Sequence, residues 1–279
     1  MLFFGYGLEP PFITYHRVSA DGALVQSEPI EVPGATMVHD FNVTRNFAIF
    51  MDLPVLFDLA AADTDGFPIQ WSDDYGARLG VMPRDGSNAD VVWYDIDPCY
   101  VYHPVNAYED GDRIIIDVCR IPHHMKPGVG DPPSELHRWT IDRAAGGVIE
   151  TQLDDNVVEF PRVPDRLIGQ PYRYGYMADF GPRAVEPGVG VRKYDLAADT
   201  STLHAFPSGQ TCGEPVFVPA ADSSEEDDGY VLCFVYDPAS DKSEFAILDA
   251  ANVEDEPIAG IHLETRVPEG FHGSWVPDA

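Results

Sequence analysis

Residues 106–121 read NAYEDGDRIIIDVCRI, and the fold prediction starts from this stretch. Runs rich in Ile, Val and Tyr stand on both sides of Asp110-Gly111, a pair that is typical of the tight turn of a β hairpin. Other segments repeat this plan, with turns at Asp21-Gly22 and near Gly146-Gly147. The repeated hairpins cover residues 12–32, 136–154 and 228–250.

The connections between these hairpins are polar and rich in proline, and no segment shows the sustained 3.6-residue periodicity of an amphipathic helix. Such a pattern is typical of a sandwich, a barrel or a propeller. Similar units recur about every 40–50 residues, which favours the blades of a propeller. We therefore expect an all-β fold that forms a single domain over residues 1–279.

Composition limits the location of the protein. Hydrophobic residues make up 44% of the chain, but no apolar run approaches the roughly 20 residues that span a bilayer. The N-terminus lacks the basic start of a signal peptide, so we expect a cytoplasmic protein. The four cysteines lack C-x-x-C spacing, and we interpret them as buried thiols.

The chain is strongly acidic, with a formal net charge of −30 from 47 acidic and 17 basic residues. A surface of this charge repels phosphate backbones, which argues against nucleic acid as a partner. The acidic residues are spread along the chain, apart from the run SSEEDD at residues 223–228. We interpret that run as a solvated loop.

Three of the nine histidines, His39, His103 and His272, share a local pattern. Each follows an apolar or aromatic run and precedes a polar or small residue, so we expect each at the end of a strand. Their spacing is too wide for a zinc finger or a helical H-E-x-x-H site. Two interpretations stay open from the residues alone: core histidines with satisfied hydrogen bonds, or a metal site built from distant segments. The other six, including His16 and His124, lie in ordinary strand or loop contexts.

Eight stretches, spread from residue 37 to residue 278, are informative only in combination. They read MVHDFNVTRNFAIFMDLP, YVYHPVNAYEDGDRIIIDVCR, LHRWTID, VVEFPRVPDRLIGQPYRYGY, CGEPVFVP, EDDGYVLCFVYD, SEFAILDA and RVPEGFHGSWVPD, in this order. Together they resemble the carotenoid cleavage oxygenases, a family that includes the lignostilbene dioxygenases and the retinoid isomerase of the visual cycle.

The resemblance implies a seven-bladed β-propeller of the carotenoid oxygenase type with one Fe(II) on its axis. In the family four histidines hold the iron without a carboxylate ligand, and His39, His103 and His272 match three of them. The fourth belongs to a segment N-terminal to this chain, and His16 does not fill its place. The chain therefore resembles the C-terminal part of the family, with the N-terminal blades missing.

Family glutamates accept hydrogen bonds from the metal-bound imidazoles. Glu159 matches the one behind His103, and Glu214 matches the one behind His272. The partner of His39 is expected upstream. Replacing Glu159 by Gln in a complete protein is expected to weaken iron binding or activity by about 10–100-fold.

The resemblance also implies the reaction: O₂ adds across one double bond of a carotenoid or apocarotenoid, giving two carbonyl products without an organic cofactor. Within the family, a lignostilbene-type dioxygenase acting on phenolic stilbenes and a non-oxidative isomerase stay open. From a different class, an inactive propeller fragment that serves only as a binding module stays open. Contact with a membrane periphery through apolar surface is also left open.

Aromatic residues are candidates for an apolar substrate tunnel, although strand core is the alternative for each of them. The tunnel candidates are Phe41, Tyr102, Tyr108, Phe160, Phe271 and Trp275.

Without the segment upstream, we expect the 279-residue chain to bind Fe(II) weakly and to cleave no carotenoid.

Overall fold

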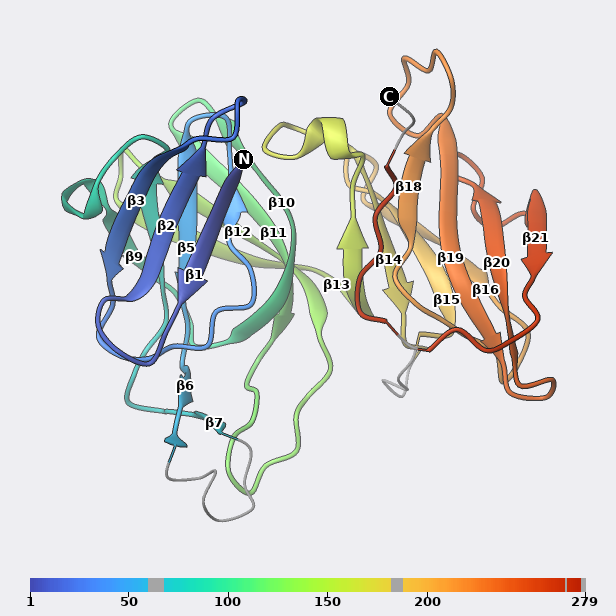
Figure 1. Ribbon diagram of the computed structural model, residues 1–279, viewed down its shortest axis with the longest axis horizontal. Helices are drawn as coiled ribbons and strands as arrows, with labels where there is room; N and C mark the ends of the chain where they lie inside the picture. Colours follow the sequence, from blue (N-terminus) through green and yellow to red (C-terminus); the bar gives the residue numbers. More distant parts are fainter. Residues whose placement is uncertain (60–67, 182–187, 269, 277–279) are drawn as a thin grey trace. The chain divides into compact units, whose positions relative to one another are not determined.

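The structure is a computed structural model that describes residues 1–59, 68–181, 188–268 and 270–276 (Figure 1). Within these ranges the chain is almost entirely β-structure, as predicted. Two short 3-10 turns lie within them, η1 (Asn88–Asp90) and η2 (Asp165–Leu167). Neither has the length and apolar character needed to cross a lipid bilayer.

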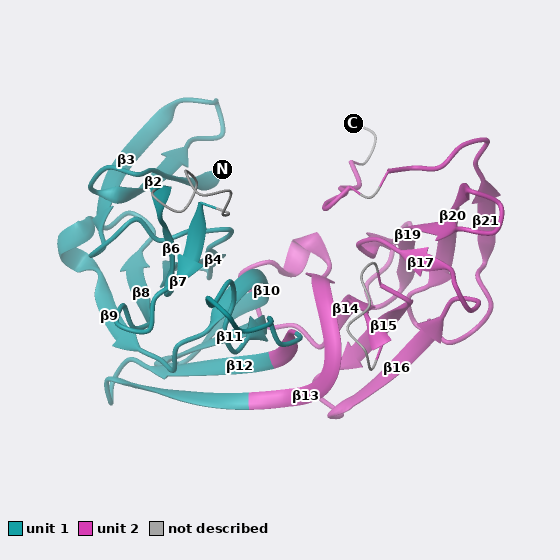
Figure 2. Cartoon of the chain, turned by 90° about the horizontal axis from the view of Figure 1, so that it is seen from below, with its two compact units in different colours: residues 1–133, 137–151 teal, residues 134–136, 152–279 magenta. Residues whose placement is uncertain are grey.

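Contacts within the chain divide it into two compact units (Figure 2). Unit 1 consists of residues 1–133 and 137–151, and unit 2 of residues 134–136 and 152–279. The strands β12 (Glu135–Asp142) and β13 (Gly147–Arg162) contribute residues to both. The expectation of one domain over residues 1–279 stays a prediction.

The strands of unit 1 pair mainly with neighbours in sequence. Their bounds are β1 (Leu2–Tyr6), β2 (Phe12–Val18), β3 (Leu24–Glu31), β4 (Asn42–Val43), β5 (Phe47–Asp52), β6 (Val55–Phe57), β7 (Ile69–Trp71), β8 (Arg78–Pro83), β9 (Val92–Asp95), β10 (Tyr100–Asp110) and β11 (Arg113–Ile121). They are hydrogen-bonded in the orders β1-β2-β3, β4-β5-β8-β9, β6-β7 and β10-β11-β12-β13.

Unit 2 has the same antiparallel character. Its further strands are β14 (Tyr174–Asp179), β15 (Gly190–Asp195), β16 (Thr200–Ala205), β17 (Thr211–Cys212), β18 (Val216–Pro219), β19 (Gly229–Asp237), β20 (Lys242–Asp249) and β21 (Ala259–His262). They are hydrogen-bonded in the orders β13-β14-β15-β16 and β17-β19-β20-β21, and β18 also pairs with β19.

The four predicted hairpins are present as β2-β3, β10-β11, β12-β13 and β19-β20. In the second of them Asp110 pairs with Arg113, so Gly111 and Asp112 form a two-residue loop. Gly111 has a φ of 59°, and a glycine with positive φ at the first loop position is typical of a type II′ turn. This turn sets the register of the hairpin back to the pair Asn106 and Asp117.

The strand β10 departs from regular pairing where Tyr102 and His103 lie. In β10 the register to β11 shifts between Val101 and Pro104, so that Tyr102 and His103 stand opposite Cys119. Two residues against one is the count of a β-bulge, which bends a strand and re-aims its side chains. Pro104 fits this irregularity because its nitrogen has no hydrogen to donate to the ladder.

The bulge corrects the prediction that the three histidines stand at strand ends. His103 lies early in the long strand β10, which continues for seven residues beyond it to Asp110. His39 lies in the irregular segment before β4, and His272 lies in the irregular segment after β21. The apolar run before His103 predicts a strand that ends at this histidine. The strand instead continues past Pro104, because the bulge accommodates the irregular pairing.

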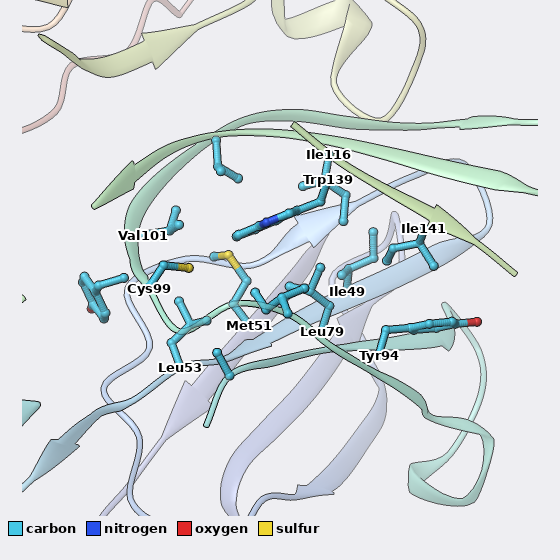
Figure 3. Close-up of a cluster of buried hydrophobic side chains, with 14 of the residues drawn as sticks. Ile49, Met51, Leu53, Leu79, Tyr94, Cys99, Val101, Ile116, Trp139 and Ile141 are labelled. Carbon is cyan, nitrogen blue, oxygen red and sulfur yellow. The ribbon is translucent and has the colours of Figure 1, made fainter. Parts of the chain in front are cut away.

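The core of unit 1 is built around Trp139, which is fully buried on β12 (Figure 3). Its ring lies among aliphatic side chains such as Ile116 and Met51, and its indole Nε1–H donates to Glu150 Oε2 at 3.0 Å. A buried indole commonly needs such an acceptor. The cluster draws on β5, β8, β10, β11 and β12, so it fixes the strand that carries His103.

The core of unit 2 contains Tyr176, Cys212 and Cys233. The buried Tyr176 hydroxyl donates to the carbonyl oxygen of Ala250 at 3.0 Å. All four cysteines lie in the described part of the chain, are buried and form no disulfide, as predicted. Burial raises the pKa of the Cys212 thiol to about 12, which keeps it protonated.

The acidic run at residues 223–228 is more than the solvated loop that we predicted. Glu226 Oε1 accepts hydrogen bonds from the backbone N–H groups of Arg173, at 2.7 Å, and Tyr174, at 2.6 Å. Asp227 Oδ2 lies 2.7 Å from Nζ of Lys193, a lysine with only 7% of its surface exposed. These contacts anchor the run on β14 and β15, because a buried ammonium group requires a counter-charge.

Candidate metal centre

His39 is held by the chain on both of its sides. Val38 is buried, and the Phe41 ring lies in a second apolar cluster of unit 1, edge-on to Tyr15 at 6.3 Å and stacked on Phe50 at 6.4 Å. Nδ1 of His39 lies 3.1 Å from the carbonyl oxygen of Tyr102. Because a carbonyl oxygen only accepts, Nδ1 carries the hydrogen, and the coordinating atom of a metal-bound His39 is Nε2.

His103 lies beside His39 within unit 1. The two rings are 4.9 Å apart, nearly perpendicular, and each offers a nitrogen within 4.8 Å of one from the other. Two nitrogens that each lie about 2.0–2.1 Å from one metal ion are at most about 4.2 Å apart. Such separations fall within the 4.8 Å limit for His39 and His103, so one ion can bind both rings. His39 and His103 thus lie together although they come from distant segments of the sequence, and the bulge in β10 is the local feature that re-aims His103.

A glutamate that the sequence analysis did not single out fastens the His39 segment to β10. Glu109 accepts hydrogen bonds from the Thr44 hydroxyl at 2.6 Å and from the Asn46 backbone N–H at 2.8 Å. Its other oxygen accepts from the Asn46 side chain at 2.9 Å. The sequence signal for Glu109 is a carboxylate directly after an aromatic residue near the end of a strand. This signal does not reveal the role of Glu109, because its partners Thr44 and Asn46 are far away in sequence.

In unit 2, His272 is tied to a buried carboxylate. Nδ1 of His272 lies 3.2 Å from Oε1 of Glu214, the contact that the sequence analysis expected. Oε2 of Glu214 accepts from the backbone N–H of Gly273 at 2.7 Å, and Arg162 lies 3.4 Å from Oε1. The Glu214 side chain is only 5% exposed, although it lies between β17 and β18 rather than in a strand. Glu214 therefore fixes both the ring and the backbone of the segment around His272.

Glu159 lies in β13. Its Oε2 accepts from the backbone N–H of Phe160 at 2.9 Å, and Phe160 has a φ of 53°. Because the left-handed region is unfavourable for a residue with a Cβ, this local geometry needs support from the surrounding chain. The predicted contact between Glu159 and His103 stays a prediction.

The six aromatic candidates are in different environments. Two are next to a candidate ligand: Tyr102 lies edge-on to His39 at 5.1 Å, and Phe160 lies edge-on to His272 at 5.9 Å. Phe41 packs in an apolar cluster, Tyr108 is half-buried in β10, and Phe271 and Trp275 are 77% and 49% exposed. A tunnel role for any of them stays a prediction.

The donor chemistry of these residues fits a metal ion. Metal-bound histidines usually donate their second N–H to a carboxylate or a carbonyl, which fixes the ring. His39 has this arrangement with the Tyr102 carbonyl, and His272 has it with Glu214. Imidazole nitrogens suit iron, copper, nickel and zinc alike, so the donors alone do not select the metal.

The amino-acid sequence matches the family described as "Retinal pigment epithelial membrane protein" over residues 1–277. A carotenoid cleavage oxygenase of Mycobacterium tuberculosis is 34% identical over 318 residues, which cover 95% of this chain and 63% of the relative. The chain belongs to the carotenoid cleavage oxygenase family. The family resemblance found in the sequence is therefore confirmed.

Two further proteins that are similar to the chain are also carotenoid or apocarotenoid oxygenases. A carotenoid 9,10(9′,10′)-cleavage dioxygenase of Crocus sativus is 32% identical, with 99% of this chain and 55% of the relative covered. A cobalt-substituted crystal structure of the Synechocystis apocarotenoid oxygenase aligns with a TM-score of 0.89 and 29% identity, covering 99% of this chain and 60% of that one. The chain thus spans less than two thirds of the length of these relatives.

The Synechocystis protein is a β-propeller enzyme, so this match confirms the predicted fold class of the carotenoid cleavage oxygenase family for the chain. The number of blades stays a prediction. The cobalt in that structure shows that a relative binds a metal ion.

Replacing Glu214 by Gln is expected to lower the affinity of the 279-residue chain for Co(II) by about 10–100-fold. Glutamine keeps the shape of the buried side chain but removes the charge that His272 contacts. Isothermal titration under argon measures the effect. Glu244→Gln is the matched control, because Glu244 Oε2 lies 3.3 Å from Nδ1 of His262, an exposed histidine of the same unit. Equal affinities in the two variants would contradict a role for Glu214 in metal binding.

Proposed function

We propose that the chain provides the iron site of an oxygenase that cleaves one double bond of a carotenoid or apocarotenoid. His39, His103 and His272 are the proposed ligands of Fe(II), with Glu159 and Glu214 as the proposed partners of two of the rings. The observation that carries the proposal is the shared arrangement of His39 and His272, each with Nδ1 on an oxygen acceptor. Family membership supplies the reaction class.

When bound, iron(II) supplies the activation of O₂. The residues of the chain orient the ligands: the Tyr102 carbonyl fixes the His39 ring, and Glu214 fixes the His272 ring. The carboxylate of Glu214 also makes the His272 ring a stronger donor, because a partner on Nδ1–H raises the basicity of Nε2. These contacts keep the rings oriented before the metal binds, which lowers the cost of assembling the site.

The proposed substrates are O₂ and an apolar conjugated polyene. One oxygen atom goes to each carbon of the broken double bond, so two carbonyl products account for both atoms of O₂. The relatives named above are carotenoid and apocarotenoid enzymes, which favours a polyene over a phenolic stilbene. The protein contributes positioning of the chosen bond, a term that accounts for several kcal/mol of a barrier in enzymes generally.

An aerobic assay of the Fe(II)-loaded chain, extended upstream to the length of its relatives, tests the proposed function. We expect loss of the polyene absorbance of an apocarotenal, with two carbonyl products that each carry one ¹⁸O atom when ¹⁸O₂ is supplied. An unchanged rate without O₂ would indicate isomerisation instead. Turnover of phenolic stilbenes alone, or iron binding without turnover of any polyene, would contradict carotenoid cleavage.

A further inference from the structure

A chain of polar side chains leads away from the candidate ligands inside unit 1. The Tyr102 hydroxyl lies 2.6 Å from Nε2 of His124, and Nδ1 of His124 lies 2.8 Å from Oδ2 of Asp131. The second oxygen of Asp131 accepts from the backbone N–H of Met125 at 2.8 Å. His124 and Asp131 belong to the loop that follows β11, where the sequence analysis saw only an ordinary proline- and glycine-rich connection.

The chemistry of the three groups indicates where the hydrogens lie. Nδ1 of His124 lies 2.8 Å from a carboxylate oxygen, which only accepts, so Nδ1 carries the hydrogen, although the contact is too bent for a regular hydrogen bond. Nε2 of a neutral His124 then has a lone pair, and the Tyr102 hydroxyl donates to it. His124 is only 8% exposed, and this burial lowers its pKa while Asp131 opposes the shift, which is consistent with a neutral ring.

Aromatic packing holds His124 in place for this contact. Its ring stacks on Tyr100 at 5.2 Å and meets Tyr102 edge-on at 5.1 Å. The backbone N–H of Trp71 donates to the Met125 carbonyl at 3.1 Å, which ties the loop to β7. The loop therefore presents His124 at a defined position beside β10.

Tyr102 connects this chain to both candidate ligands of unit 1. Its backbone carbonyl accepts from Nδ1 of His39 at 3.1 Å, and its ring lies edge-on to that imidazole. Tyr102 is also the residue before His103, within the bulge of β10. Anchoring its phenol limits how far this bulged backbone turns, and so limits the movement of the carbonyl that orients His39.

We infer that Asp131, His124 and Tyr102 form a chain of polar contacts that positions His39 for metal binding. The three are positioning residues, because none of them is a proposed ligand. The loop after β11 thereby controls how tightly unit 1 holds its two histidines. The metal role rests on the proposed function, whereas the chain of polar contacts itself does not.

The tautomer of His124 tests the chain without any metal. Long-range ¹H–¹⁵N correlation spectra of the 279-residue protein distinguish the two neutral tautomers of each imidazole. We expect His124 to carry its hydrogen on Nδ1, and we expect Tyr102→Phe to change the ¹⁵N shift of Nε2. The opposite tautomer, with the hydrogen on Nε2, would overturn the inference.

Metal affinity tests the positioning role. Tyr102→Phe and His124→Phe keep the ring packing and each remove the same hydrogen bond, so each is expected to weaken Co(II) binding by about 3–10-fold. The double variant is expected to lose no more than the larger single loss, because the two changes act on one interaction. Asp131→Asn keeps an acceptor for Nδ1–H and is expected to lose less. The absorption spectrum of bound Co(II) should change along with the affinity.

Lys126→Gln is the matched control, because it breaks a contact in the same loop, between Lys126 and Asp73 at 2.6 Å, outside the chain of polar contacts. Should His124→Phe fail to fold, Tyr102→Phe alone still decides. Affinities in the Tyr102 variant equal to those of the wild type, or losses that multiply in the double variant, would overturn the inference and leave the proposed function standing. A wild-type protein that binds no metal would overturn the proposed function, and the positioning role with it.

Discussion

Replacing His103 by alanine is expected to lower the affinity of the protein for Fe(II) or Co(II) by more than about 100-fold. Loss of a partner behind a ligand costs about 10–100-fold, and loss of the ligand itself is expected to cost more. In this variant His39 remains, but the imidazole whose centre lies 4.9 Å from its own is absent, so unit 1 keeps one of its two proposed ligands. Metal content after anaerobic loading and desalting measures the effect.

His16→Ala is the control for this substitution. His16 lies in β2 of the same unit, stacked on Phe3 at 4.7 Å, and belongs to a plain hairpin strand. Both variants remove an imidazole from a strand, so a general effect of the change on folding would appear in both. Metal content in the His103 variant equal to that of the His16 variant would contradict the assignment.

Replacing Arg138 by leucine is expected to lower the free energy of unfolding by about 3–5 kcal/mol. Asp117 is fully buried in β11, and Arg138 in β12 meets both of its oxygens, with Nε at 2.6 Å and Nη2 at 2.8 Å. Leucine leaves that carboxylate buried without the guanidinium that neutralises it. Urea denaturation measures the change as a lower midpoint at an unchanged m-value.

Two further variants separate this mechanism from a general loss of charge. The double variant Asp117→Leu/Arg138→Leu is expected to recover most of the loss, because replacing both partners of a buried pair by apolar groups is often neutral. Lys126→Ala removes an exposed pair with Asp73 in the same unit and is expected to cost less than about 1 kcal/mol. Similar losses in the Arg138 and Lys126 variants would contradict the argument.

The hairpins were predictable because their signals are local. Alternating apolar residues and a glycine at the turn are both visible within a short window, as at Gly111, where the structure has the positive φ that glycine tolerates. The positions of the histidines relative to the strands were not predictable in this way. The bulge at Tyr102 and His103 depends on pairing with β11, and a sequence window shows no register.

In the candidate site, too, some residues could be predicted from the sequence and others could not. The family resemblance gave the three histidines and Glu214, and the structure shows the contact of Glu214 with His272. It did not give His124, because His124 follows another histidine in a loop without apolar periodicity, and its partners Tyr102 and Asp131 belong to a strand and a later part of that loop. Three-dimensional contacts of this kind have no local sequence signal.

The central claim is that one metal ion binds to His39, His103 and His272, and a crystal structure of the Co(II)-loaded protein tests it most directly. Cobalt is a suitable probe because a crystal structure of the Synechocystis relative is cobalt-substituted. Anomalous scattering at the cobalt edge should show one ion at about 2.0–2.2 Å from a ring nitrogen of each of the three histidines, by analogy with zinc–histidine bonds. A cobalt ion bound elsewhere, or a structure in which any of the three rings lies out of reach of it, would contradict the claim.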